Sequence, residues 1–516
     1  MVQEEIVKGI NPIIWADMPD MDVIRVKDVY YMVSTTMHMM PGGVILRSYD
    51  LIHWEIVNYI YETLENNAAS NLEGKNNIYG KGMWAASLRY YKQTFYVCFV
   101  ANDTGKTYLF QTKEIEGKWQ KSFIEGFYHD GSLLFDEEKV FIIYGNKNIY
   151  LTELKEDLSG PKENGIHKKI ITDTEQVLLG YEGAHFYKIK NKYYVFLIHW
   201  LSSGNKRRVQ ACFVADEITG EYKGKDVLDD DLDYYNSGIA QGGIVDTPDG
   251  EWYAMLFQDH GAVGRIPVLV PISWENDFPV FGIEGKVPKQ LTVKTNKVGY
   301  SYSPIIDSDS FLYEKEVDLK KVWQWNHNPK PEMWSVTDRK GYLRIKTGKL
   351  SDSILEAQNI LTQRTMGPWC EGTVYVDGSH LNNGDFAGIA AFQGCFGFIG
   401  LTKEEDQYYL VMRGKERREK DLEEIEYARL KINTAYIRLK AKFNFKDNVD
   451  EVEFFYQDED KWYQLGRAHK LYFTLDHFMG CRIALFLYST KEIGGYVDYK
   501  DFEYNVLMNN NEVCNR

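Results

Sequence analysis

Three acidic residues, a tryptophan and a glutamine stand at equivalent places in a segment that recurs five times along the first half of the chain. Each lies eleven or twelve residues before an aromatic residue that marks its repeat. If the repeats pack around one axis, five side chains meet there: Asp20, Trp84, Asp130, Glu182 and Gln241. Two carboxyl groups that flank one bond can hydrolyse a glycoside, one as general base and the other as proton donor. A third carboxylate raises the donor's pKa by like-charge repulsion, and the indole offers a sugar ring a flat apolar face.

The repeat that must position these side chains is a strand, a short polar turn, a second strand with an aromatic residue and a third alternating strand. Turns such as Asn191-Lys192 and Asp249-Gly250 are typical of hairpins. Five such units within residues 1–285 predict a five-bladed β-propeller. A β-sandwich or several separate hairpin domains is the alternative. The first strands of the units are expected to begin at Asp22, Ser87, Ser132, His185 and Gly243.

The second half of the chain is also rich in strands, so the predicted fold class is all-β. Residues 286–305 lose the alternation and are expected to form a linker. Dense alternating strands from 306 to 516 predict a concanavalin-like β-sandwich. The run of mixed charge at 415–426 is expected to be a solvated loop or edge.

Length and composition limit the classes of function. A chain of 516 residues is too long for one compact core, which favours two or more domains. The net charge of -15 disfavours nucleic acid and anionic membranes as partners. No apolar run long enough to span a membrane and no signal-peptide pattern occurs, so we expect a cytoplasmic protein, or a periplasmic or secreted one if a leader was removed. A homo-oligomer is left open.

The segments around the five side chains resemble those of glycoside hydrolase family 43, which includes β-xylosidases and α-L-arabinofuranosidases. Asn11-Pro-Ile-Ile-Trp-Ala-Asp-Met-Pro-Asp resembles the segment that holds the general base, and Tyr181-Glu-Gly-Ala-His the one that holds the general acid. Further similar segments, which extend the resemblance over the whole chain, are Trp84-Ala-Ala-Ser, His129-Asp-Gly-Ser, His260-Gly-Ala-Val-Gly-Arg and Gly494-Gly-Tyr-Val-Asp-Tyr. The chain departs from the family pattern where proline is usual, at Met21, Gly131 and Ala184.

The resemblance implies an exo-acting, inverting hydrolase that releases xylose or arabinofuranose from hemicellulose-derived oligosaccharides. Asp20 would be the general base and Glu182 the general acid, while Asp130 orients Glu182 and raises its pKa. The expected substrate-binding residues are Trp84, Gln241, His260 and Arg265. No cofactor is required, although a calcium ion could sit on the propeller axis with His260 as its ligand.

Related two-domain proteins close one end of the pocket with the sandwich. Phe386 is one candidate for this contact, with a place in a core strand as the alternative. Residues 37–40 are expected to line the rim, although Met39 and Met40 could instead pack beneath it.

Two other functions fit the predicted architecture. Retaining fructosidases of the invertase type use Asn-Asp-Pro-Asn-Gly, Arg-Asp-Pro and Glu-Cys segments, and this chain contains none of the three. A non-catalytic carbohydrate-binding propeller is expected to lack at least one of the three acids, and all three are present.

Overall fold

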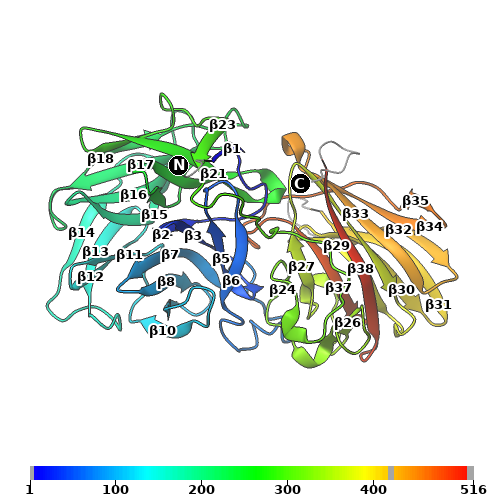
Figure 1. The fold of residues 1–516 in the computed structure, drawn as a ribbon. Coiled ribbons are helices and arrows are strands. Elements are labelled where there is room, and N and C mark those ends of the chain that lie inside the picture. Colours follow the sequence, from blue (N-terminus) through cyan, green and yellow to red (C-terminus); the bar gives the residue numbers. More distant parts are fainter. Residues whose placement is uncertain (1–4, 417–423, 508–516) are drawn as a thin grey trace.

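The five predicted repeats form the five blades of a β-propeller, and a β-sandwich packs against it (Figure 1). The computed structural model describes residues 5–416 and 424–507, so most of the predicted charged run lies outside the described residues. Helices in the described ranges are short 3-10 turns, and none could cross a membrane. These turns are Gly261–Val263, Glu316–Asp318, Pro331–Met333, Ile354–Glu356 and Lys446–Asn448.

Each blade is an antiparallel sheet of four strands. Blade one contains β2 (Asp22–Val26), β3 (Val29–Ser34), β5 (Gly42–Ser48) and β6 (Glu55–Tyr61). Blade two contains β7 (Met83–Tyr91), β8 (Thr94–Ala101), β9 (Lys106–Thr112) and β10 (Gln120–Ile124). Blade three contains β11 (Ser132–Asp136), β12 (Lys139–Tyr144), β13 (Asn148–Leu154) and β14 (His167–Thr172). Blade four contains β15 (Val177–Ile189), β16 (Lys192–Leu201), β17 (Arg208–Ala215) and β18 (Lys223–Leu228). Blade five contains β19 (Ile244–Asp246), β20 (Trp252–Asp259), β21 (Arg265–Glu275) and β22 (Phe278–Phe281).

The innermost strands begin close to the predicted places. The predicted starts at Asp22 and Ser132 are the observed ones, and β19 begins one residue after the predicted Gly243. Strands β7 and β15 begin several residues earlier than predicted, because register shifts lengthen both strands. The ring closes where β19 meets β2, so blade five contacts blade one.

The stretch expected to be a linker contains a strand. β23 (Gln290–Lys294) pairs with β1 (Ile6–Ile10), the first strand of the chain, in a separate two-stranded sheet. The chain therefore returns to its own beginning before it enters the second domain.

A buried ion pair joins the blades at the centre of the propeller. Arg89 Nη1 lies 2.6 Å from Asp22 Oδ2, and His185 Nδ1 lies 3.1 Å from Asp22 Oδ1. Arg89 also donates to Ser132 Oγ in blade three at 2.7 Å, and the Tyr187 hydroxyl accepts the first backbone N–H of β19 in blade five at 3.0 Å. Burial alone would raise the pKa of Asp22, but Arg89 and His185 hold it at about 2. All five blades therefore contribute to one polar network.

The second domain consists of two packed antiparallel sheets. One sheet contains, in spatial order, β32 (Glu424–Ile432), β31 (Gln407–Lys415), β30 (Gly397–Glu404), β29 (Asp385–Phe392), β37 (Arg482–Ser489), β27 (Leu361–Arg364), β24 (Gln324–Asn326) and β4 (Met39–Met40). The other contains β25 (Trp334–Ser335), β26 (Leu343–Lys346), β38 (Tyr496–Leu507), β28 (Trp369–Asp377), β33 (Tyr436–Asn444), β34 (Glu451–Asp458) and β35 (Lys461–Gln464), while β36 (His469–Lys470) pairs with β34.

The edge strand β4 belongs to the propeller by sequence but completes a sheet of the sandwich. Met40 is the register partner of Trp325, and Met39 is the partner of Asn326. All four side chains are buried. The two domains are thus joined by strand pairing as well as by side-chain packing.

We expect Asp22→Asn to lower the free energy of unfolding by about 3–5 kcal/mol, because the Arg89 guanidinium would stay buried without its counter-charge. The control is Asp246→Asn, because Asp246 pairs with Arg25 in a more exposed setting and its loss should cost about 1 kcal/mol or less. Denaturant unfolding of the two variants measures the difference. Equal losses would contradict the central role of the Asp22–Arg89 pair.

Candidate active site

Three of the five predicted ring residues share an unusual backbone conformation. Asp20, Asp130 and Gln241 have φ angles of 53°, 49° and 61°, in the left-handed region that non-glycine residues rarely adopt. Each lies two or three residues before the innermost strand of its blade. All three are buried, at 7% exposure. Such strained positions gather at functional sites, where the fold holds a side chain in one direction.

The other two ring residues lie at β-bulges. The register of β7 shifts between Met83 and Ala86, around Trp84, and that of β15 shifts on both sides of Glu182. A bulge turns side chains out of the regular alternation of a strand. Gly183 follows at a φ of 62°, and a Cβ there would lie 2.7 Å from the Gln241 side chain. The glycine therefore allows Gln241 to lie directly beside the residue that follows Glu182.

Asp20 is held by an arginine of the last blade. Arg265 Nη1 lies 2.9 Å from Asp20 Oδ1, and both side chains are almost fully buried. The backbone N–H of Arg265 donates to Asp17 Oδ1 at 2.8 Å, while Asp17 Oδ2 accepts the backbone N–H of Gly480 from the sandwich at 2.8 Å. The loop that carries Asp20 is therefore fixed to both blade five and the second domain.

Asp130 and Glu182 lie side by side with a histidine between them. His129 Nε2 is 3.7 Å from Asp130 Oδ2 and 3.7 Å from Glu182 Oε2. Asp130 Oδ2 accepts the backbone N–H of Gly183 at 3.1 Å, and Asn146 Nδ2 donates to Glu182 Oε2. Both carboxylates therefore have partners that fix their direction.

The pKa values of Asp130 and His129 are both raised, for different reasons. Burial raises the pKa of Asp130 to about 6; the His129 charge opposes this rise, while Glu182 and Asp20 add to it. For His129, burial lowers the pKa, but hydrogen bonding to Glu182 and the charges of both carboxylates raise it to about 9. His129 is therefore a cation at neutral pH.

A second arginine faces the acids. Arg208, at the start of β17, pairs with Asp259, and its guanidinium lies 5.5 Å from the centre of the Phe257 ring. Burial and the nearby Arg265 lower its pKa to about 10, while Asp20 and Glu182 act in the opposite sense. Two cations thus balance the negative charge of the ring from the side of blades four and five.

The sandwich reaches this site through Phe478, not through Phe386. The Arg265 guanidinium lies 4.6 Å from the centre of the Phe478 ring, and the Trp84 ring centre lies 5.6 Å from it. Phe386 instead stacks on Tyr488 within the sandwich, with ring centres 5.1 Å apart, which is the core-strand alternative. The sequence offered no signal for Phe478, because only the docking of the two domains brings it to the propeller.

The residue before Phe478 belongs to a buried cluster of histidines between the domains. His477 stacks on Tyr79 with ring centres 4.0 Å apart, and His38 lies 5.0 Å from His327 and 5.8 Å from His477 by the same measure. Within the described chain, both ring nitrogens of His38 lack a hydrogen-bond partner. Burial lowers the pKa of His477 to about 4 and those of His38 and His327 well below their usual range. All three are neutral at pH 7.

The sequence suggested that residues 37–40 line the rim of the pocket, but the structure places them elsewhere. All four are buried at the domain interface, where Met39 and Met40 form β4. The alternative, that these two methionines pack beneath the rim, describes their place better.

His260 is 2% exposed and lies against Tyr234, with ring centres 3.8 Å apart. Its Nε2 lies 2.7 Å from Gln258 Oε1, and its buried Nδ1 has no hydrogen-bond partner in the described ranges. Calcium usually takes six to eight oxygen ligands. In the described chain, these ring and hydrogen-bond contacts of His260 include no carboxylate. Calcium binding by His260 therefore stays a prediction. Contact of His260 with substrate also stays a prediction.

One group of three described side chains has nitrogen and oxygen atoms close enough for a metal ion, all within 4.8 Å of one another: His129, Asp130 and Glu182. Two close carboxyl groups and an imidazole are also an arrangement suited to proton transfer, and we assign the group to acid–base chemistry.

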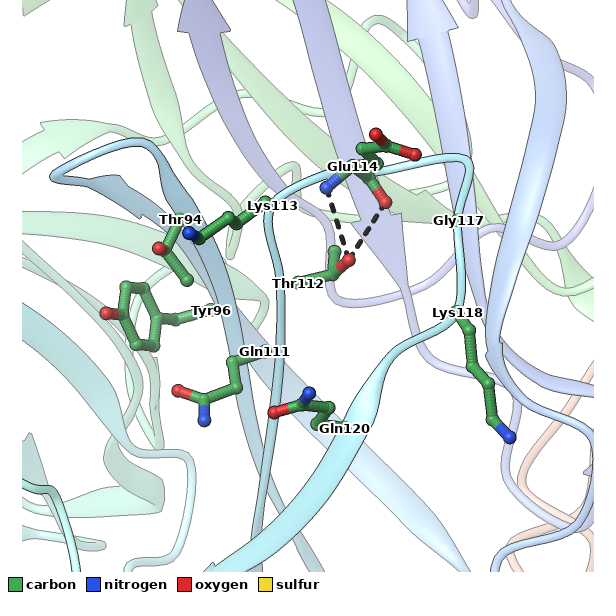
Figure 2. A pocket seen from close by; sticks show the side chains of 9 residues that line it. All are labelled: Thr94, Tyr96, Gln111, Thr112, Lys113, Glu114, Gly117, Lys118 and Gln120. Carbon is green, nitrogen blue, oxygen red and sulfur yellow. Dashed lines mark hydrogen bonds between the residues drawn. The ribbon is translucent and has the colours of Figure 1, made fainter.

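A separate hollow of about 430 Å³ lies on the outer part of blade two, between β8, β9 and β10 (Figure 2). Its lining includes Thr94, Tyr96, Gln111 and Gln120. None of the five ring residues lines it. It is thus distinct from the convergent carboxylates.

Sequence reasoning missed several residues of the site besides Phe478. His129 adjoins Asp130 in the chain, so its nearness could have been inferred. Asn146 follows Gly145 in the turn between β12 and β13, and a polar residue in that turn is a weak signal. Arg208 lies in an ordinary strand sequence, where nothing marks it.

Comparison with known proteins places the two domains in known families. The model of glycosyl hydrolases family 43 matches residues 10–279, and that of the beta xylosidase C-terminal concanavalin A-like domain matches residues 310–505. A beta-xylosidase from Formosa agariphila is 28% identical over 96% of this chain and 90% of its own length. A non-reducing end alpha-L-arabinofuranosidase from Bacteroides ovatus is 26% identical over 69% of this chain and 68% of its own.

A solved structure of a bifunctional GH43-CE protein from Bacteroides eggerthii superimposes with a TM-score of 0.91 and 42% identity. The match covers 98% of this chain and 64% of that protein. The chain thus spans about two thirds of the length of this relative, which has a further portion that the present sequence does not match.

The histidine cluster makes stability depend on pH. Because the folded-state pKa of His477, about 4, lies below the usual 6.5, its stabilising effect is complete above pH 6.5 and is lost as the pH falls toward 4. At pH 5 the loss approaches about 2 kcal/mol per such histidine. We expect a smaller fall in denaturation midpoint between pH 7 and pH 5 for His477→Gln than for the parent protein. The exposed His167→Gln should behave as the parent; the same fall in all three would contradict the assignment.

Proposed function

The chain belongs to glycosyl hydrolases family 43, and on this premise we propose that it removes single pentose units, β-D-xylose or α-L-arabinofuranose, from the ends of hemicellulose-derived oligosaccharides. It is an O-glycosidase, and its expected course is inversion at the anomeric carbon. The observation that carries the proposal is the convergence of three carboxylates in unlike surroundings around the propeller axis.

Asp20 is suited to the role of general base. Its carboxylate lies 2.9 Å from the Arg265 guanidinium, a contact that fixes the direction of the group that would accept a proton from water. The water then attacks the anomeric carbon as the glycosidic bond breaks, so no covalent intermediate forms. An inverting pair needs a separation of roughly 6.5–9.5 Å between the two carboxyl groups to leave room for that water.

Glu182 is suited to the role of general acid. Its neighbour Asp130 is buried, and Asn146 and the bulge in β15 fix the direction of the Glu182 carboxyl group. The proton passes to the oxygen of the leaving group as the glycosidic bond breaks. Asp130, which also accepts the N–H of Gly183, orients this acid.

Attack on chain ends is supported by the aromatic contact between the domains. Trp84 and Phe478 lie close together beside Arg265, so the sandwich covers one side of the site. A pocket closed on one side accepts a terminal sugar and excludes the interior of a chain. Two of the relatives described above are a beta-xylosidase and an arabinofuranosidase, which supports both pentoses as substrates.

The roles of the general acid and the general base are distinguished by comparing substrates with two different leaving groups. Nitrophenolate leaves with little help from a proton, whereas a sugar alcohol needs it, so Glu182→Ala should lose far more activity on xylobiose than on nitrophenyl β-D-xyloside. Asp20→Ala should lose about 100-fold or more on both, the usual contribution of a general base. The exposed Asp216→Ala is the control and should keep the parent's rate.

Absence of cleavage of both nitrophenyl pentosides by the parent protein would overturn the pentosidase proposal. Full activity in Asp20→Ala would overturn the role of the base. An NMR time course of the first product decides the stereochemistry, because initial release of the retained anomer is incompatible with a single displacement.

Phe478→Ala should weaken binding of the terminal sugar, because it removes the ring that faces Trp84 and covers Arg265. Loss of about 1.4 kcal/mol of aromatic contact corresponds to about a tenfold rise in KM, with a smaller change in kcat. Steady-state kinetics on xylobiose measures both constants. Phe123→Ala, on the exposed edge of blade two, is the matched control, and an unchanged KM in Phe478→Ala would exclude contact with substrate.

A further inference from the structure

We propose that His129 is a positioning residue, a fixed positive charge between Asp130 and Glu182 that keeps Asp130 ionised and sets the pH range in which Glu182 holds its proton. This inference rests on the proposed function, because it assigns His129 a role in the reaction of those two carboxyl groups. It adds a fourth ionisable group to the three acids.

The geometry places the imidazole between the two carboxylates. Nε2 lies 3.7 Å from one oxygen of each, and the side chain is 25% exposed. The backbone carbonyl of His129 accepts the N–H of Gly145 at 3.0 Å. The next residue, Asn146, donates to the Glu182 oxygen that faces His129. One turn of blade three therefore holds both the histidine and the acid.

The charged groups around His129 come from every blade that forms this part of the site. Asp130 adjoins it in blade three, Glu182 faces it from blade four, and the Trp84 ring lies 6.0 Å away in blade two. The charge of Asp20 in blade one raises the pKa of Asp130. The charges of Asp20 and Glu182 also raise the pKa of Arg208 in blade four. The charged partners of His129 among these contacts are Asp130 and Glu182, and both are acidic.

The pair needs this cation because the two carboxyl groups compete for one proton. Asp130 is the more buried of the two, and burial favours its neutral form. If Asp130 took that proton, Glu182 would have none to donate. The imidazole lies 3.7 Å from one oxygen of each carboxyl group, so its positive charge favours the ionised form of both and opposes uptake of the proton by Asp130.

The test is the pH dependence of kcat/KM for a nitrophenyl pentoside. Gln at position 129 keeps a donor near the place of Nε2 but removes the charge. An opposite charge within 4–6 Å typically shifts a carboxyl pKa by 1–3 units. We therefore expect the alkaline limb of the profile, which reports the acid, to move up by about one pH unit in His129→Gln. The acidic limb should move the same way if Asp130 contributes to it.

The matched variant is His129→Lys, which keeps the charge and changes the shape. Its alkaline limb should lie closer to that of the parent than to that of His129→Gln. His167→Gln, in β14 of the same blade, is the control and should leave the profile unmoved. An unmoved alkaline limb in His129→Gln, or an equal shift in the lysine variant, would overturn the proposal, because a purely structural role would lower the rate without moving the limb.

A second measurement does not depend on turnover. The imidazole signal that disappears from the NMR spectrum in His129→Gln should titrate in the parent protein near pH 9, well above the usual 6.5. Titration at or below 6.5 would overturn the proposal even if the pentosides prove not to be substrates. Conversely, a signal near pH 9 in a protein that cleaves neither pentoside would overturn the proposed function and leave the charge of His129 established.

Discussion

The buried Asp22–Arg89 pair is the contact on which the rest of the propeller depends. It lies one layer beneath the site, because in each blade a residue of the central network follows a ring residue by a few positions. Asp22 follows Asp20, Arg89 follows Trp84, and Ser132 follows Asp130. A propeller with a loose centre could still form five sheets, but its site residues would not keep a common axis. The network therefore supports both stability and the alignment of the acids.

At the level of the site, unusual backbone conformations set the direction of the ring side chains. Asp20, Asp130 and Gln241 adopt left-handed backbone angles, and Trp84 and Glu182 stand at bulges. None of these conformations is the one a free peptide prefers, so each must be held by tertiary contacts. The hydrogen bond from Gly183 to Asp130, 3.1 Å long, shows how this is done: the backbone beside one acid fixes the carboxylate of another.

The sequence was enough to predict the five blades and the sandwich, because each depends on a local pattern repeated along the chain, while the roles of the five ring residues stay predictions. Alternating strands and turn residues recur at similar spacing, and equivalent positions in a propeller converge. What the sequence could not show depends on contacts between distant segments. Phe478 reaches the propeller only after the domains dock, and Arg208 faces the acids only because blades four and five meet. The strand β23 was missed because its pairing partner, β1, lies nearly 300 residues earlier.

The strand β4 makes the order of synthesis matter. Met39 and Met40 leave the ribosome early, but their partner strand at Gln324–Asn326 follows some 280 residues later. At 5–20 residues per second this is a wait of tens of seconds. During that time all five blades, the last of which ends at Phe281, are synthesised, while the methionines at 39 and 40 have no sheet to join. The candidate site is therefore completed last, when the sandwich emerges, and a chain cut short before that point would carry Asp20, Asp130 and Glu182 beside an exposed apolar strand.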